Sequence, residues 1–377
     1  MRRVVHVDHL IQYRLPFFQG VRSRLAENDI VYDVYSGSLT KQHTGKSDEG
    51  DLDWAHKIGN IHFDIGSTHL IWQPVLKEIW NCNLAIVGQQ NRYLVNYVAQ
   101  TLKPFRPSKL AFWGHGKNFQ AEAPDGFAES WKRFWATRCD WWFGYTEETR
   151  RIVEGYGFPS DRITVFNNSI DTKKYKEWAE EISADEIAAL KKTLGITTDN
   201  IAIYVGGIYD IKRIDFLIDA AKLIRLAIPD FTLLIVGGGP DQVTAERAAV
   251  ENSWIKYLGP KFGRENVALI KMSKAFLMPG AVGLAILDCS AVGTPMITTT
   301  YPFHGPEFSY IRSGANGLIV QDWQSTSAYA NAVSSVLQNQ QIQAALSSGA
   351  KQLANDYSIE AMVEKFCDGV INCLSRH

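Results

Sequence analysis

The chain has 377 residues, which is too long for one ordinary hydrophobic core and suits two domains of roughly 150–200 residues each. Apolar residues make up 46% and charged residues 21% of the sequence, a composition typical of a folded globular protein and not of a disordered chain. The net charge of −1 excludes a general attraction to nucleic acid, so no nucleic-acid partner is expected.

Cysteine usage and hydropathy indicate the compartment. The five cysteines are dispersed without CxxC or metal-type spacing, which predicts reduced thiols and a reducing compartment: Cys82, Cys139, Cys289, Cys367 and Cys373. The first residues, MRRVVHVDHLIQYRLPFF, lack the apolar core of a secretory signal, and no window approaches the roughly 20 apolar residues of a membrane span. We therefore predict a cytoplasmic protein and leave contact with a membrane surface open.

The first half of the chain alternates between predicted strands and helices. Six short β-rich runs predict strands at 2–7, 30–37, 83–88, 109–116, 141–146 and 163–168. A helix is expected to begin near Pro16, and the polar, glycine-bearing residues 37–60 predict a loop or excursion. Strands that alternate with helices imply a parallel sheet covered on both faces.

The second half repeats this alternation. Six runs predict strands at 200–207, 231–240, 254–259, 275–280, 295–300 and 317–320. Residues 213–228 have the i, i+3, i+4 apolar spacing of a helix, and the tail from about 326 to 377 is almost wholly helical in pattern. We predict an N-terminal domain of residues 1–172, a C-terminal domain of residues 173–357, and a final helix, 358–377, that packs on the N-terminal domain.

Glycine turns follow three strands of the second half. Gly206 and Gly207 come directly after one strand, and Lys212 and Arg213 precede the next helix. Glycines let a backbone approach a ligand closely, and two cations can neutralise a diphosphate. The alternative is a tight turn with solvated charges.

The other two turns are weaker signals when each is taken alone. The turn around Gly238, in LLIVGGGPD, is more often structural. The stretch PGAVGLAILD offers the N–H groups of Val282, Gly283 and Leu284 at the start of a helix, where backbone donors and the helix dipole favour anions.

Taken together and in this order, the turns resemble the C-terminal domain of the family 4 glycosyltransferases, which are retaining enzymes of the GT-B fold. The family pattern "NG-V/I-D", "vGRL…KG…Li-A", "l-i-vG-GP" and "P-S…E-GFGL…LEAMA-G-PVI" corresponds here to FNNSID (166–171), YVGGIYDIKRIDFLIDAA (204–221), LLIVGGGPD (233–241) and MPGAVGLAILDCSAVGTPMIT (278–298). The later stretches HGPEF (304–308) and SGANGLIV (313–320) also fit, so the resemblance covers about residues 165–322. It implies an α/β GT-B fold, in which two Rossmann-like parallel-sheet domains face each other across a cleft and the C-terminal helix crosses back to the N-terminal domain.

This chain departs from the family pattern at two charged positions. The family has two acids separated by seven residues, and these positions hold Gly280 and Asp288 here. The resemblance implies that Asp288 holds the ribose hydroxyls of a nucleotide, while the usual acid against the donor sugar is missing. The family's Arg of "GRL" is Gly207, so Lys212 and Arg213 are expected to carry the charge that binds phosphate. Bacterial surface-polysaccharide glycosyltransferases of the glycosyl transferases group 1 type look similar.

Two residues are candidates for the catalytic role. We expect Glu307, in HGPE, to supply part of the missing carboxylate function at the donor, the alternative being a cap of the following helix. His115 lies between two glycines at the end of a predicted strand, where the family often places a histidine facing the donor; the alternative is a structural histidine. Either residue would compensate for Gly280, which would make room for an unusual donor contact.

Acceptor contacts are expected in the first half. Asp8, Tyr13 and Arg14 follow the first strand, where an acceptor cleft would begin, and a salt bridge within the loop is the alternative. Lys117 could favour a developing negative charge, or it is simply a solvated lysine.

The resemblance also implies the reaction. In the mechanism commonly proposed for the family, the leaving phosphate accepts the proton of the incoming hydroxyl, so backbone N–H groups and cations do most of the stabilisation. We therefore predict transfer of a sugar from a nucleotide-sugar donor to a saccharide or lipid-linked acceptor, with no cofactor and no metal. A nucleotide-sugar epimerase of the same fold and a catalytically silent nucleotide-sugar-binding protein are the alternatives.

Aromatic and basic residues mix in ESWKRFWATRCDWWF (129–143) and LKPFRPSKL (102–110), which suits an anionic membrane surface. Aromatic residues packed into the core are the alternative.

Overall fold

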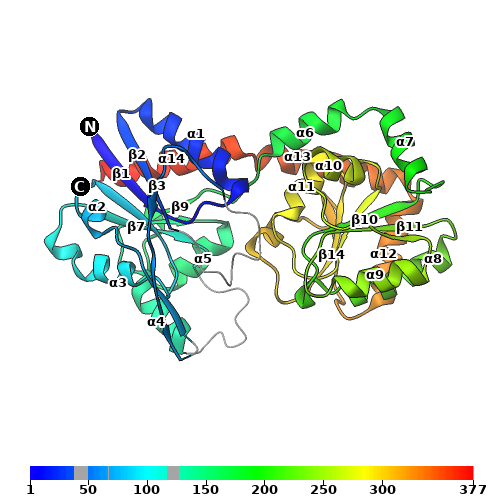
Figure 1. Ribbon diagram of the computed structural model, residues 1–377, viewed down its shortest axis with the longest axis horizontal. Coiled ribbons are helices and arrows are strands. Elements are labelled where there is room, and N and C mark those ends of the chain that lie inside the picture. Colours follow the sequence, from blue (N-terminus) through cyan, green and yellow to red (C-terminus); the bar gives the residue numbers. More distant parts are fainter. Residues whose placement is uncertain (38–49, 67, 117–126, 377) are drawn as a thin grey trace. The chain divides into compact units, whose positions relative to one another are not determined.

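The computed structural model describes residues 1–37, 50–66, 68–116 and 127–376, and it shows parallel sheets flanked by helices (Figure 1). Contacts divide the chain into two compact units: Met1–Asn168 with Ile359–His377, and Ser169–Ser358. Each unit has its own sheet and its own buried core.

The first unit is built on a seven-stranded parallel sheet in the order β3-β2-β1-β6-β7-β8-β9. The strands are β1 (Arg2–Val7), β2 (Ile30–Gly37), β3 (His56–Ile58), β6 (Leu84–Gly88), β7 (Lys109–Gly114), β8 (Trp141–Gly144) and β9 (Ile163–Val165). The six strands predicted from the apolar runs are therefore confirmed. They read as continuous apolar runs because helices cover both faces of the sheet, and β6 for example is buried along its whole length.

Helices connect these strands. They are η1 (Gln12–Arg14), α1 (Leu15–Ala26), α2 (Leu76–Trp80), α3 (Leu94–Thr101), η2 (Lys103–Phe105), α4 (Phe127–Ala136), α5 (Glu147–Gly155), η3 (Ser160–Arg162) and α14 (Ile359–Ser375). Pro16 lies in the first turn of α1, as expected, because its missing N–H has no acceptor to lose there.

The segment predicted as a loop or excursion contains more structure than its composition indicates. Within residues 37–60, β3 adds to the sheet edge beside Tyr35–Gly37. Just after that segment, where no element was predicted, β4 (Ile61–Ile65) pairs with β5 (Thr68–Trp72) in a separate antiparallel hairpin. Both additions are made by main-chain pairing over short stretches. Polar side chains such as His56 and Lys57 can occupy an edge strand, so hydropathy gave no signal for β3, whereas the alternating IHFDI of β4 does have the pattern of a strand.

The last helix, α14, belongs to the core of the first unit, as the sequence predicted. Its Phe366 is fully buried, and its ring lies 4.5 Å from that of Phe143, 5.1 Å from that of Phe17 and 5.6 Å from that of Trp113, measured between centroids. The helix therefore fills the face of the sheet that α1 leaves partly uncovered.

The second unit has a six-stranded parallel sheet in the order β12-β11-β10-β13-β14-β15. The strands are β10 (Ile201–Val205), β11 (Thr232–Val236), β12 (Ile255–Tyr257), β13 (Ala275–Met278), β14 (Met296–Thr299) and β15 (Gly317–Val320). All six predicted strands are thus confirmed. The chain runs outward from β10 in one direction and from β13 in the other, so the boundary between β10 and β13 is the topological switch point, where ligands bind in such sheets.

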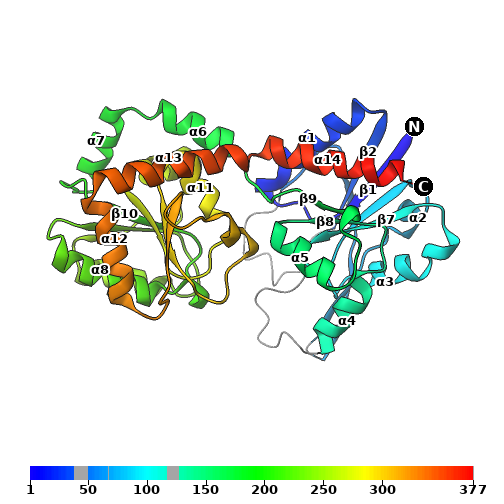
Figure 2. The same ribbon diagram turned by 180° about the vertical axis from the view of Figure 1, so that it is seen from behind.

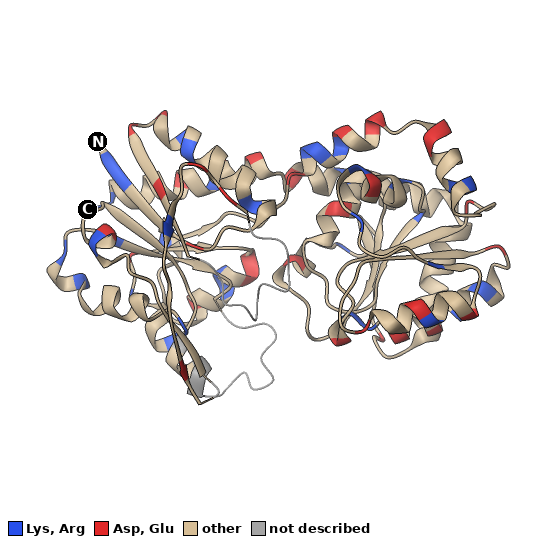
Figure 3. Ribbon diagram, in the orientation of Figure 1, with Lys and Arg blue, Asp and Glu red and all other residues tan. Residues whose placement is uncertain are grey.

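Helices cover both faces of this second sheet (Figures 1 and 2). They are α6 (Thr172–Glu181), α7 (Ala184–Thr193), η4 (Asp210–Lys212), α8 (Ile214–Ala227), α9 (Gln242–Glu251), α10 (Gly263–Lys271), α11 (Ala285–Val292), η5 (Pro306–Tyr310), α12 (Thr326–Gln338) and α13 (Gln340–Asp356). α8 packs with α9 and α12 on one face, while α6, α10, α11 and α13 form the opposite layer. Charged residues gather on the helices and loops, whereas the strands carry few (Figure 3).

Two further expectations concern the whole chain. All five cysteines are buried free thiols, in agreement with the predicted reduced state. Among the helices of the described residues, none combines the length and the hydropathy that a bilayer crossing requires.

Phe366→Ala is expected to destabilise the first unit by about 3–5 kcal/mol, because it removes a large ring from a closely packed aromatic core. Leu226→Ala is the matched control: Leu226 is 80% exposed on α8, and its truncation should change stability by less than about 0.5 kcal/mol. Urea denaturation of both variants measures the difference. Equal stability of the two variants would show that α14 does not contribute to the core.

Candidate active site

The turns after β10 and β11 pack directly against each other at the carboxyl edge of the second sheet. The Gly206 N–H donates to the Val236 carbonyl at 3.0 Å, and the Ile208 N–H donates to the Gly238 carbonyl at 2.9 Å. A Cβ atom on Gly237 would lie 1.8 Å from the Gly206 carbonyl oxygen. The glycine run is therefore required first by the contact between the two turns.

Lys212 joins this pair of turns to the third one. It ends η4, and its Nζ donates to the carbonyl of Ala281, in the turn after β13. The Ala281 N–H in turn donates to the Ile211 carbonyl at 2.9 Å. The cation predicted to bind phosphate thus lies at the switch point between β10 and β13.

Gly280, the position of the missing acid, is closely covered by backbone. A Cβ atom there would lie 2.3 Å from the Ile211 carbonyl oxygen and 2.8 Å from the Cα of Lys212. The chain's own η4 segment occupies the space where a side chain at this position would begin. Gly280 therefore makes room for η4, and the expected room for an unusual donor contact is not found at this position.

His304 holds the turn after β13 by a contact that the sequence did not indicate. Its Nδ1 accepts the Val282 N–H at 3.0 Å, so its Nε2 carries the proton and donates to the Thr299 carbonyl at 2.9 Å. The imidazole stacks on Phe308 with ring centroids 3.9 Å apart. Burial, opposed by the bond to Thr299, lowers the pKa of His304 to about 4, so the ring is neutral near pH 7.

Of the three backbone N–H groups predicted to face an anion, that of Val282 is already bonded, whereas those of Gly283 and Leu284 are still available in the described structure. The Val282 N–H was expected to face a diphosphate, but it is already bonded to His304. Gly283 and Leu284 follow at the start of α11, and within the described part of the chain no backbone or side-chain acceptor takes their N–H groups. These two donors fit the predicted anion site.

Asp288, the predicted ribose ligand, lies on the first turn of α11 against α6. The hydroxyl of Tyr175 bonds to its carboxyl group, and Asn266 bonds to the same Tyr175 hydroxyl. Burial raises the pKa of Asp288 to about 7, a shift that the bond from Tyr175 reduces. The carboxyl group of Asp288 is therefore protonated more readily than that of an exposed aspartate, and it already has one partner.

Arg213 does not fit its predicted role at a diphosphate. Its Nη1 donates to the Trp323 carbonyl at 2.6 Å, and its guanidinium lies 4.0 Å from the ring centre of Phe216. The backbone of Arg213 is left-handed, with φ of 57°, at the position where the family pattern has the Gly of "KG". The side-chain contacts offset the roughly 1–2 kcal/mol that this conformation costs a non-glycine residue.

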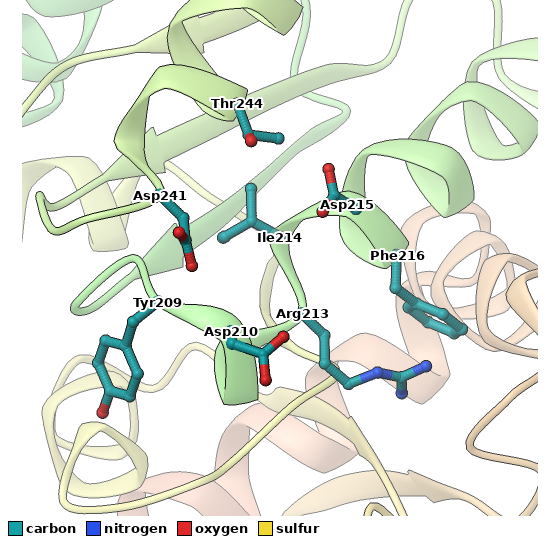
Figure 4. A pocket seen from close by; sticks show the side chains of 8 residues that line it. All are labelled: Tyr209, Asp210, Arg213, Ile214, Asp215, Phe216, Asp241 and Thr244. Carbon is teal, nitrogen blue, oxygen red and sulfur yellow. The ribbon is translucent and has the colours of Figure 1, made fainter.

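A pocket of about 260 Å³, lined by residues of η4, the start of α8 and the start of α9, is also unsuited to a diphosphate (Figure 4). Its lining holds three carboxylates, from Asp210, Asp215 and Asp241, against the one guanidinium of Arg213, and like charges repel a phosphate. Within the described residues, no group of three or more acidic, His or Cys side chains is arranged to hold a metal ion.

Glu307 lies in η5, next to the turn that His304 holds. Its side chain is only 4% exposed, and one carboxylate oxygen would lie 3.0 Å from a Cβ atom on Gly305. The Gly305 N–H donates to the Val282 carbonyl at 2.8 Å, so Glu307 is close to the turn after β13. Its catalytic role stays a prediction.

In the first unit, the predicted acceptor residues form a buried cluster. Nη1 of Arg14 lies 3.4 Å from a carboxylate oxygen of Asp8. Nη2 of Arg14 donates to the Tyr145 hydroxyl at 2.8 Å. Burial alone would raise the pKa of Asp8, but the bond from His9 and the charges of His9 and Arg14 lower it to about 2. The alternative of a loop salt bridge is thus the arrangement found for Asp8 and Arg14, which are both buried.

Tyr145, which the sequence reasoning missed, connects this cluster to His115. Its ring centroid lies 4.1 Å from that of His115, and both residues follow carboxyl ends of neighbouring strands, β8 and β7. Tyr13 lies beside the cluster, 5.4 Å from the Arg14 guanidinium. Only the pairing of two parallel strands could have indicated Tyr145. Lys117 lies outside the described residues.

Comparison with known proteins identifies the class. Residues 199–339 match the family described as Glycosyl transferases group 1, in agreement with the predicted resemblance. The structure of Anabaena Alr3699/HepE in complex with UDP superposes with a TM-score of 0.71 at 14% identity, covering 98% of this chain and 100% of that one. WaaG, a glycosyltransferase involved in lipopolysaccharide biosynthesis, superposes with a TM-score of 0.65 at 15% identity, covering 97% and 98%. The fold is therefore GT-B.

The curated relatives are more specific in name. The chain is 26% identical over 228 residues to D-inositol 3-phosphate glycosyltransferase of Corynebacterium urealyticum, covering 56% of this chain and 52% of the relative. It is 28% identical over 229 residues to the enzyme of the same name from Rhodococcus jostii, covering 57% and 48%. The chain thus spans about half the length of the curated relatives it matches.

The neutral state of His304 predicts a measurable pH dependence. Its pKa falls from 6.5 to about 4 on folding, so the folded protein binds fewer protons between these values. The stabilisation is complete above pH 6.5 and is lost as the pH falls toward 4, by up to about 3 kcal/mol. His304→Gln should show a correspondingly smaller loss between pH 7 and pH 4 in urea denaturation. Other titrating groups are common to both proteins and cancel, so identical slopes would contradict this assignment.

Proposed function

We propose that the protein is a retaining glycosyltransferase that moves a sugar from a nucleotide-sugar donor to a saccharide or lipid-linked acceptor, in bacterial polysaccharide or glycan biosynthesis. The observation that carries the proposal is the position of Lys212 beside the turn that starts α11. A cation and two backbone N–H groups, those of Gly283 and Leu284, meet there at the switch point of a sheet of the GT-B type. Such a constellation fits the diphosphate of a donor.

The chemistry proposed for this site depends on the leaving diphosphate. Lys212 and the N-terminal dipole of α11 would stabilise the charge that develops as the bond to the sugar breaks. The oxygen released from the sugar would accept the proton of the incoming hydroxyl, so no metal or cofactor is required. Asp288 would accept hydrogen bonds from the ribose hydroxyls. With its pKa raised to about 7 by burial, it does so as a carboxylate above neutrality.

The acceptor side of the proposal rests on the first unit. His115 follows the carboxyl end of β7 between two glycines, and the buried cluster below it holds Tyr145 against its ring. We assign His115 the role of orienting the acceptor hydroxyl. Arg14 and Asp8 are assigned a positioning role through Tyr145, because both are buried and bonded to each other.

A second candidate function is nucleotide-sugar binding without turnover. The observation in its favour is Gly280, where the backbone of η4 occupies the place of the usual acid. An epimerase of the same fold is disfavoured because it would need paired acids and a further base.

One experiment separates these functions. The protein is incubated with a panel of nucleotide sugars, beginning with UDP-glucose because Alr3699/HepE has been crystallised with that ligand. Free nucleotide and the donor sugar are then followed. Transfer or slow hydrolysis releases the nucleotide, epimerisation changes the sugar without release, and silent binding produces only a shift in Tm.

Lys212→Met should weaken the binding of the released nucleoside diphosphate about 10–100-fold, because it removes a charge-assisted bond worth about 1.5–3 kcal/mol. Methionine keeps the aliphatic stem but removes the Lys212 bond to the Ala281 carbonyl, so the Tm of the variant is compared with that of the wild type. Lys222→Met is the control, since Lys222 lies exposed on α8 and pairs only with Asp219 among the described residues. Isothermal titration with UDP measures both variants. Equal affinities would place the diphosphate elsewhere.

We also propose that the first unit contacts an anionic membrane at the inner face. Trp131 and Phe134 are exposed on α4, and the guanidinium of Arg138 lies 3.7 Å from the Phe134 ring centre. Basic and aromatic side chains in this combination suit a bilayer interface.

Phe134→Asp is expected to reduce co-sedimentation with vesicles containing anionic lipid at least severalfold, because it places a charge where an aromatic ring would enter the interface. Phe262→Asp, at an exposed position of the second unit, should have no such effect. Wild-type binding should fall as salt is raised. Binding that is absent or unaffected by salt would remove this part of the proposal.

A further inference from the structure

An apolar groove lies on the first unit, near the amino ends of strands of its parallel sheet. It has a volume of about 280 Å³ and is lined by Leu76, Lys77, Ile79, Trp80, Ala99, Leu102 and Arg106. α2 precedes β6 and η2 precedes β7, so the groove borders the amino ends of these parallel strands. His115 and Tyr145 follow carboxyl ends, so the groove is separate from the residues proposed for transfer.

Arg106 is the unusual member of this lining. Its side chain is only 7% exposed, and its Nη1 donates to the Ile79 carbonyl at 3.2 Å. Its other two nitrogens, Nε and Nη2, are buried and have no hydrogen-bond partner among the described residues. A guanidinium with two unsatisfied donors is costly to bury.

No ion pair between Arg106 and an acidic side chain is found among the described residues. The Ile79 carbonyl also accepts bonds from Ser108 Oγ at 3.1 Å and from Cys82 Sγ at 3.2 Å, so it is shared by three donors. The charge of Asp140 acts on Arg106 and favours its charged form, but the Asp140 carboxylate is paired with Lys103 at 2.7 Å. Burial accordingly lowers the pKa of the Arg106 guanidinium.

The two unsatisfied donors indicate the chemistry of a ligand. Nε and Nη2 are neighbouring N–H groups of the planar guanidinium, and such a pair matches the two oxygens of a carboxylate. The remaining lining is apolar except for Lys77, a second cation, and no acidic side chain lines the groove. Trp80 is 41% exposed at this surface. An alkyl chain that ends in a carboxylate satisfies both the charge and the apolar surface.

We propose that this groove binds one single-chain alkyl carboxylate, with its carboxylate paired to Arg106 and Lys77 and its chain against Leu76, Trp80 and Leu102. The site is independent of the proposed transferase reaction. A small shift of the Arg106 side chain exposes the two donors to the ligand, and the ion pair replaces a buried charge that has no partner.

The first test uses the full chain and needs no variant. Decanoate, decanol and decyltrimethylammonium are each titrated below their micellar concentrations by isothermal calorimetry. Decanoate should bind at one site, decanol at least about tenfold more weakly, and the cation not measurably, because a bond to a charged group is worth about 1.5–3 kcal/mol. Absence of decanoate binding, or equal binding of decanoate and decanol, overturns the proposal.

Two variants then locate the site. Arg106→Met replaces the unpaired charge by an apolar side chain, so it should raise the Tm of the ligand-free protein and weaken decanoate binding at least about tenfold. A lower Tm with unchanged decanoate affinity would show that Arg106 is a structural residue, satisfied by water, and would overturn the proposal. Lys77→Gln, at an exposed position, should fold normally and lose affinity severalfold even where Arg106→Met does not fold; unchanged affinity in Lys77→Gln also contradicts it. Lys222→Gln is the control without effect.

Discussion

Close packing of three backbone turns is the constraint on which the second unit depends. The turn after β10 contacts the turn after β11 so closely that a single methyl group on Gly237 would overlap the Gly206 carbonyl oxygen. On its other side, η4 fills the space beside Gly280. Hydrogen bonds from Lys212 and Ala281 then fix the third turn to the first. The spacing of these turns sets where a diphosphate would meet the start of α11.

This arrangement explains how a donor site can be built with few carboxylates. In the proposed site, the groups that suit negative charge are a lysine, two backbone N–H groups and the N-terminus of a helix. The acidic pocket lined by Asp210, Asp215 and Asp241 borders the same turn, and the hydrogen bond from Arg213 to the Trp323 carbonyl is a structural contact of that turn. His304 adds a neutral imidazole that supports the turn from below without placing another charge there.

Buried charges are treated in two different ways in the first unit. Asp8 and Arg14 neutralise each other, and the Tyr145 hydroxyl satisfies a further donor, so this cluster can form a rigid base for His115. Arg106 is buried at the opposite edge of the same sheet with two donors unsatisfied. Arg14 also has one buried nitrogen, Nε, without a hydrogen-bond partner among the described residues, but its charge faces a carboxylate. No ion pair of Arg106 is found in the described part of the chain, and a buried charge without a partner is costly, which sets Arg106 apart as the proposed ligand contact.

The sequence by itself determined the strands, the two sheets and the order of the glycine turns, because apolar periodicity and turn residues are local properties. It also indicated the family and the place of the C-terminal helix. It could not find β3, where main-chain pairing gives structure to a segment with little hydropathy signal. The β4–β5 hairpin was not predicted either, although β4 has the alternating pattern IHFDI. Only the tertiary structure decided which groups of the turns are already bonded. The Val282 N–H donates to His304, and Arg213 donates to the Trp323 carbonyl. The backbone of η4 fills the space beside Gly280. These assignments depend on contacts between segments up to about a hundred residues apart, and no local pattern records them.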